Sequence, residues 1–314
     1  DGRFRTLEVK GVEIRTPPEA DVASAVARLL AIEDKLAATL ARHDLGLGIA
    51  GFNPVTPAYD FKPPLNPWEN ELRQSHHAYD APQVTNLSFG PDINLSMPGW
   101  DATRCLDAAR KLEWYAPFLV PFSFSSPFFA GQVWPGWSKR THERAHLRPT
   151  TKLYYPAMQA PASPLVYPPR HPGETGRIEF KAFDAMPDLE VLTACCHLLE
   201  GVCLAHDLPG RGRPPDLGLY RRAARQAFDD ERIRAGSAKV LDRAIAALGR
   251  AGDTQGVLAL NVLVELLEQR RTPAHRLLED HRKTGLMYKA GGHRSANPIS
   301  SPEQPHIGET LGVQ

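Results

Sequence analysis

Glu179 and Lys181 stand two positions apart in the segment RIEFKAFD, residues 177–184. The segment is typical of a β-strand, in which residues two apart point to the same face. A carboxylate there can hold Mg²⁺ while the neighbouring ammonium holds a phosphate oxygen, which suits phosphoryl transfer. A solvated ion pair on an exposed sheet face is the alternative. The pair supports a site hypothesis only if other polar strands accompany it.

A second polar strand is indicated by DINLSMP, residues 92–98. Asp92, Asn94 and Ser96 alternate with apolar residues, so three oxygen-bearing side chains are expected on one face. An ordinary half-buried strand with a solvated polar side would show the same pattern. Glu13 in VEIRTPP is, by itself, only a charged strand residue.

The elements that must position these residues do not follow a regular crossover pattern, which favours an antiparallel or mixed sheet. Hydrophobic periodicity predicts strands over 4–15, 45–53, 85–98 and 176–184. It predicts helices over 18–43, 67–74, 101–114, 189–206 and most of 217–283. We therefore predict an α+β fold with a sheet-containing core at 1–212, a helical region packed on it at 213–290 and a flexible tail at 291–314.

Composition argues against several classes of function. The 314 residues carry a net charge of +1, from 37 basic and 36 acidic side chains, so no overall field attracts nucleic acid or an anionic membrane. The chain has four cysteines, too few for a disulfide scaffold, which favours a reducing, cytoplasmic setting. We find no long apolar run and no secretion signal at Asp1, so we expect a soluble protein.

Four segments, in their order along the chain, resemble segments of a known protein family: VEIRTPP, DINLSMP, WYAPFLVPFSFSSPFFAG and RIEFKAFDAMPD. A weaker match is LYRRAARQAF, similar to a basic helix in one branch of the same family. This order resembles the glutamate-cysteine ligases and related carboxylate-amine ligases. The resemblance implies a glutamine-synthetase-type fold, with a curved, mainly antiparallel sheet, flanking helices and a helical C-terminal part.

The resemblance also implies a reaction, in which ATP and Mg²⁺ convert a substrate carboxylate to an acyl phosphate that an amine then attacks. The acyl donor would be an amino acid, glutamate by family, and both substrates would be small molecules. Carried over by position, the Mg²⁺ ligands would be Glu13, Asp92 and Glu179, with Asp92 in the place of a family histidine. Catalytic residues would be Lys181, Arg144 and Arg148, and cofactor contacts would be made by Asn94, Ser96, Lys181 and Arg225.

Three departures from the family pattern keep other functions open. The family's opening strand, with two Glu separated by one residue, has no counterpart before Glu13. Asp92 adds a negative charge where the family has histidine, and Lys181 lacks the bidentate fork of arginine. The alternatives are a noncatalytic binding or scaffold protein on the same fold and a small-molecule phosphotransferase. Oligomeric state is left open, and a homo-oligomer is compatible with all three.

One predicted helix also carries metal-ligand residue types: His197, Cys196, Cys203 and His206. Zinc normally needs four ligands that converge from more than one element. We therefore interpret the cysteines as small buried thiols of a core helix.

Overall fold

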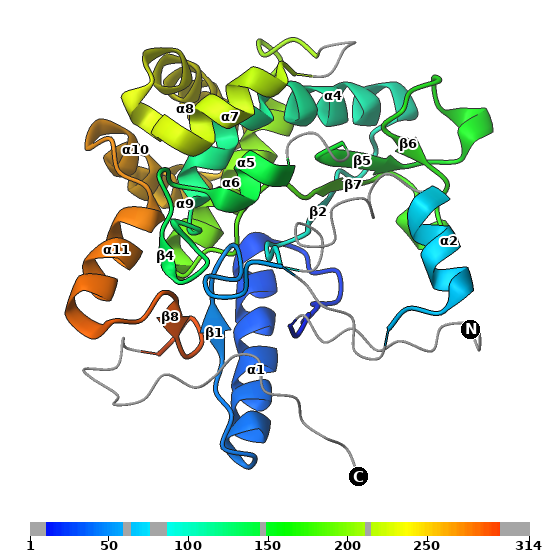
Figure 1. The fold of residues 1–314 in the computed structure, drawn as a ribbon. Helices are drawn as coiled ribbons and strands as arrows, with labels where there is room; N and C mark the ends of the chain where they lie inside the picture. The colour runs from blue at the N-terminus through cyan, green and yellow to red at the C-terminus, as the bar shows by residue number, and fades with distance from the viewer. Residues whose placement is uncertain (1–10, 59–63, 76–86, 145–148, 211–214, 296–314) are drawn as a thin grey trace.

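The computed structural model describes residues 11–58, 64–75, 87–144, 149–210 and 215–295 (Figure 1). Its α-helices are Val22–Ala41 (α1), Pro67–Ser75 (α2), Ala102–Leu119 (α4), Lys139–Arg144 (α5), Leu189–Leu204 (α6), Leu217–Gln226 (α7), Glu231–Ala251 (α8), Thr254–Ala259 (α9), Asn261–Glu268 (α10) and Pro273–Thr284 (α11). Its strands are Gly48–Ile49 (β1), Ile93–Ser96 (β2), Phe128–Phe129 (β3), Gln132–Val133 (β4), Thr151–Tyr154 (β5), Val166–Tyr167 (β6), Arg177–Phe180 (β7) and Lys289–Ala290 (β8). Helices combined with small sheets confirm the α+β class. None of the described helices is both long and apolar enough to cross a membrane.

The main sheet has four strands in the order β2-β7-β5-β6. Strand β7 pairs antiparallel with β2 and with β5, whereas β5 pairs parallel with β6. The sheet is therefore mixed, as the order of elements indicated. Helix α4 lies along it in Figure 1 and contacts β5 and β7.

The sheet has one apolar and one polar face because its strands alternate in residue type. Leu153, Ile178 and Phe180 point to the apolar face and are fully buried in the core with Leu112 of α4. Burying a side chain of this size contributes about 1.5–3 kcal/mol. These contacts fix the sheet on α4 and direct the opposite, polar face away from the core.

Helices α4, α6 and α8 form the centre of the molecule and contact one another. Asp101 caps α4 by accepting the N–H of Arg104, and Asp230 caps α8 by accepting the N–H of Ile233. Helix α6 approaches α8 closely at Gly201, where an added Cβ would lie 2.7 Å from the Cβ of Ala244. A larger residue at 201 would push the two central helices apart.

Several predicted boundaries need correction. The described part of the first predicted strand, 11–15, is not in a strand, so Glu13 lies in an irregular segment. The strand predicted at 45–53 is reduced to β1, with one further bridge between Phe52 and Ser88. The helix predicted to end near 114 continues to Leu119, through Pro117. The predicted domain boundary at 212/213 lies outside the described residues.

Asp184, at the end of the RIEFKAFD segment, is a buried structural centre. Its carboxylate accepts hydrogen bonds from the Ser126 hydroxyl at 2.6 Å, the Ser125 N–H at 3.1 Å and the Ser138 hydroxyl at 3.1 Å. The guanidinium of Arg140, 1% exposed, lies 3.7 Å away. Burial raises the pKa of Asp184, and Arg140 and the hydrogen bonds oppose that effect. The group ties the loop before α6 to the serine-rich segment after α4.

Segments distant in sequence are joined beside α1. Strand β1 pairs antiparallel with β8, as Figure 1 shows. The Nδ1 atom of His293 lies 2.7 Å from Glu33 of α1, and its Nε2 lies 3.1 Å from the carbonyl oxygen of Met186. The first five residues of the predicted flexible tail, 291–295, are thus anchored, and the rest of that tail lies outside the described residues.

Candidate functional site

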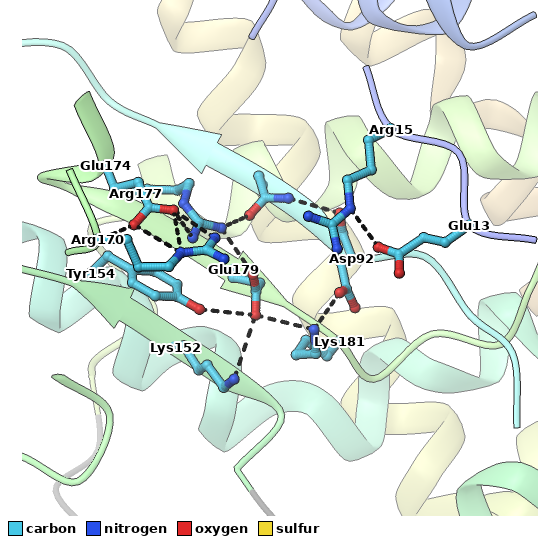
Figure 2. A network of polar contacts seen from close by, with 11 residues as sticks. Glu13, Arg15, Asp92, Lys152, Tyr154, Arg170, Glu174, Arg177, Glu179 and Lys181 are labelled. Atoms are coloured by element: carbon cyan, nitrogen blue, oxygen red, sulfur yellow. Dashed lines mark hydrogen bonds and ion pairs between the residues drawn. The ribbon is translucent and has the colours of Figure 1, made fainter. Parts of the chain in front are cut away.

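The polar face of the main sheet carries two rows of side chains that cross its strands. The strand register places Asn94, Glu179 and Lys152 opposite one another on β2, β7 and β5. The next row consists of Ser96, Arg177 and Tyr154. Side chains opposite one another in antiparallel strands point to the same face, so both rows lie on one face of the sheet. Figure 2 shows Lys152, Tyr154, Arg177 and Glu179 of these rows.

Glu179 is the centre of this network and is 7% exposed. Its carboxylate lies 3.1 Å from the Lys181 ammonium, 2.9 Å from the Arg177 guanidinium and 3.8 Å from the Lys152 ammonium. Burial alone would raise its pKa, but Lys181, Arg177 and Lys152 outweigh burial, so the pKa of Glu179 is lower than usual. Glu179 is therefore an ionised carboxylate.

Lys181 contacts two carboxylates, one on strand β7 and one on the residue directly before strand β2. Its Nζ contacts Glu179 and also forms an ion pair with Asp92, which precedes β2. Asn94 belongs to the same cluster, because its side-chain oxygen accepts from Arg177 at 2.5 Å. Figure 2 shows the two carboxylates approaching the Lys181 ammonium from opposite sides. The structure therefore brings together four of the predicted site residues, Asp92, Asn94, Glu179 and Lys181.

A second layer of charges surrounds Arg177. The carboxylate of Glu174 accepts from Arg177 at 2.9 Å and from Arg170 at 2.7 Å. The Arg177 guanidinium also lies over the Tyr154 ring, 3.8 Å from its centroid. Burial, and next the charge of Glu179, raise the pKa of Tyr154, so its hydroxyl stays protonated. Hydrogen bonds from Arg170 lower the pKa of Glu174 to about 2.

We expect acid to weaken this second layer before it unfolds the core. The folded-state pKa of Glu174, about 2, is below its ordinary value of 4.5, so its stabilisation is complete above 4.5 and is lost as pH falls toward 2. Urea unfolding at about pH 5.5 and about pH 3 should therefore show Glu174→Gln less stable than the unmodified protein at the higher pH, with a smaller difference at the lower pH. An equal difference at both values would contradict this assignment.

Glu13 lies next to the network but is not buried in it. Its carboxylate accepts from Arg15 at 2.7 Å, and both side chains are well exposed. Glu13, and more weakly Asp92, raise the pKa of Arg15. The positive charge of Arg15 is thus stabilised by the negative charges of both Glu13 and Asp92. Figure 2 shows these three side chains at one edge of the cluster.

The remaining predicted site residues have different surroundings. Arg144 donates to the backbone carbonyl of Lys181 at 3.2 Å. Ser96 is exposed on β2. Arg225 donates to the Pro135 carbonyl at 2.8 Å and lies 4.4 Å from the centroid of the Trp134 ring, so its described contacts do not include the sheet network. Arg148 lies outside the described residues.

A pocket opens beside the backbone of Lys181. It is lined by Arg140, Thr141, Arg144, Thr150, Lys181 and Tyr220. The pocket is small, and its lining also includes Val120, Pro149 and Ala182. The Arg140 guanidinium is buried and donates to the carbonyl oxygens of Lys181 and Ala182, so it is bound within the fold.

Sequence reasoning missed six members of the network: Arg15, Lys152, Tyr154, Arg170, Glu174 and Arg177. Arg177 had a detectable signal, since it stands two positions before Glu179 in the same alternation. Lys152 and Tyr154 also alternate, in the segment TKLY, but four residues are too few to give a clear periodic pattern. Glu174 belongs to a short 3₁₀ turn, and such a turn has no periodic residue pattern from which it could be predicted.

Comparison with known proteins gives no relative, since no protein-family model and no curated protein matches this chain.

Proposed function

We propose that this protein is an ATP- and Mg²⁺-dependent ligase that joins an amino-acid carboxylate to an amine through an acyl phosphate. One observation carries the proposal: Glu179 and Asp92 converge on Lys181 on the polar face of the sheet. Two carboxylates and a cation on one surface are the groups needed to position a metal and a transferring phosphoryl group. The proposal includes a glutamine-synthetase-type arrangement of the sheet, which the resemblance suggested.

The donor chemistry fits Mg²⁺, a hard cation that binds carboxylate and amide oxygens. Glu179 and Asp92 would hold it, with Glu13 reaching the same edge of the cluster. When bound, the metal neutralises charge on the phosphates. The lowered pKa of Glu179 keeps this ligand ionised at neutral pH.

Basic side chains of the protein would position the phosphate and the substrate carboxylate. Lys181, 11% exposed on its side chain, would hold a phosphate oxygen as a point charge. Arg144 lines the neighbouring pocket, and its guanidinium would bind a substrate carboxylate. Asn94 and Ser96 provide oxygens at the exposed end of β2 for the nucleotide.

A noncatalytic binding or scaffold protein is the second candidate, and the pairing pattern favours it. Glu179, Asp92, Glu174 and Glu13 each already contact a basic side chain. Such a self-neutralised surface can stabilise the sheet with no ligand. The two candidates differ in whether Mg²⁺ and ATP compete with these internal ion pairs.

Isothermal titration of the protein with ATP in the presence of Mg²⁺ separates them. We expect saturable binding that Glu179→Gln weakens at least about tenfold, equivalent to about 1.4 kcal/mol, because the amide cannot supply the ligand charge. Glu268→Gln, an exposed change on α10, should leave the affinity unchanged. Absence of detectable binding to the folded protein would refute the ligase and support the scaffold.

Product analysis then identifies the reaction. Incubation with ATP, Mg²⁺ and pairs of amino acids and amines should yield ADP, phosphate and an amide. A stable phosphorylated small molecule in place of the amide would instead show a phosphotransferase.

A further inference from the structure

Three metal-ligating side chains meet away from the sheet, where α6 contacts the turn between α8 and α9. His197 and Glu200 stand three positions apart on α6 and therefore share a face. Asp253 precedes α9 and comes from a separate element. Their donor atoms all lie within 4.8 Å of one another.

The distances suit metal coordination better than hydrogen bonding. The Nδ1 atom of His197 lies 3.4 Å from an Asp253 oxygen and 3.6 Å from a Glu200 oxygen. Strong N–H···O hydrogen bonds are shorter, about 2.7–3.2 Å. Ligands about 2.0–2.2 Å from a tetrahedral zinc ion lie roughly 3.4 Å from one another.

The Nδ1 atom of His197 gives a second indication. It is buried, and no residue that the structure describes forms a hydrogen bond with it. The side chains of His197, Glu200 and Asp253 are 12%, 34% and 29% exposed, so an ion can enter from solvent. A buried imidazole nitrogen that faces two carboxylates from two elements is a typical metal-binding arrangement.

Local structure aims the Asp253 carboxylate at His197. One of its oxygens accepts the Gly256 N–H at 2.8 Å and caps α9, so the other is directed to the imidazole. A Cβ at residue 256 would lie 2.1 Å from that second oxygen and 2.8 Å from His197 Nδ1. Glycine at this position therefore leaves room between the donors.

We propose that His197, Glu200 and Asp253 form a binding site for a divalent transition metal, Zn²⁺ foremost, separate from the proposed Mg²⁺ site. Imidazole with carboxylate ligands suits Zn²⁺, and three protein ligands leave a fourth position for water. The metal would clamp α6 to the α8–α9 turn. Neither Cys196 nor Cys203 belongs to this group of converging donor atoms.

Titration of the full chain with Zn²⁺, in saturating Mg²⁺ and without ATP, tests the site. We expect one equivalent of Zn²⁺ to bind and to raise the thermal midpoint. His197→Gln and Glu200→Gln should each weaken Zn²⁺ affinity at least about tenfold, since each removes a ligand. His206→Gln, at an exposed histidine beside the same helix, should bind like the unmodified protein.

Three outcomes would overturn the proposal: absence of Zn²⁺ binding, binding that neither ligand variant weakens, or equal weakening by His206→Gln. Glu200→Gln keeps the shape of a partly exposed side chain, so it stays informative even if His197→Gln does not fold, as judged by circular dichroism. Glu179→Gln should retain full Zn²⁺ affinity. This last result makes failure of the Mg²⁺ site distinguishable from failure of the Zn²⁺ site.

Discussion

Asp184→Ala is expected to destabilise the protein by about 3–5 kcal/mol, which is a large part of the stability of a typical domain. The carboxylate is fully buried, and it accepts from Ser125, Ser126 and Ser138. Its removal leaves a cavity and withdraws the carboxylate beside buried Arg140. A buried cation that loses its anionic neighbour costs far more than an exposed one.

Chemical denaturation followed by circular dichroism measures this effect. Asp184→Asn should be less damaging than Asp184→Ala, because an amide oxygen still accepts from one serine. Asp242→Ala on the exposed side of α8 is the matched control and should change the unfolding free energy by less than about 0.5 kcal/mol. If Asp184→Ala unfolds within about 1 kcal/mol of the unmodified protein, Asp184 does not have this structural role.

Lys181→Met is expected to lower the rate of ATP-dependent amide formation by about a hundred- to a thousandfold. The methionine side chain keeps most of the length of lysine but cannot hold a phosphate oxygen. It also leaves Glu179 and Asp92 without the ammonium between them. This prediction depends on the proposed ligase activity.

The measurement is ADP release with the amino-acid and amine pair that gives the highest rate. Lys181→Arg should restore activity to within about tenfold, because it returns the charge and adds a bidentate fork. Lys239→Met, at an exposed lysine of α8, controls for loss of surface charge. A Lys181→Met protein with more than about a third of the original rate would remove Lys181 from the phosphate-binding role.

The sheet site could be predicted in part because its chemistry follows a strand period. Glu179 and Lys181, and likewise Asp92 and Asn94, alternate with residues of the opposite face, so each pair could be assigned to one surface. That the two surfaces are neighbours depends on the register that sets Asn94 opposite Glu179. Such long-range pairing is not encoded in local periodicity. The prediction that these strands act together came from the family resemblance.

Other parts of the fold and of the site could not be predicted from the local sequence, because their structure depends on distant residues. Strand β5 is four residues long and follows a basic segment, so its pairing with β7 decides its structure. Glu13 was expected in a strand, yet its short segment has no partner strand among the described residues. The burial of Asp184 is purely tertiary, because the serines that surround it lie 46–59 positions away. The metal-ligand residue types noted in the sequence belong to one predicted helix, whereas Asp253 comes from another element.

The contact between His293 and Glu33 has a consequence for folding during synthesis. Glu33 is 6% exposed, and the histidine that covers it is made 260 residues later. At about 5–20 residues per second, a ribosome needs roughly 13–52 s to reach it. Over that interval the Glu33 carboxylate lacks the imidazole partner that it has in the folded protein. Because the two residues are 260 positions apart, we expect this contact to form late in folding.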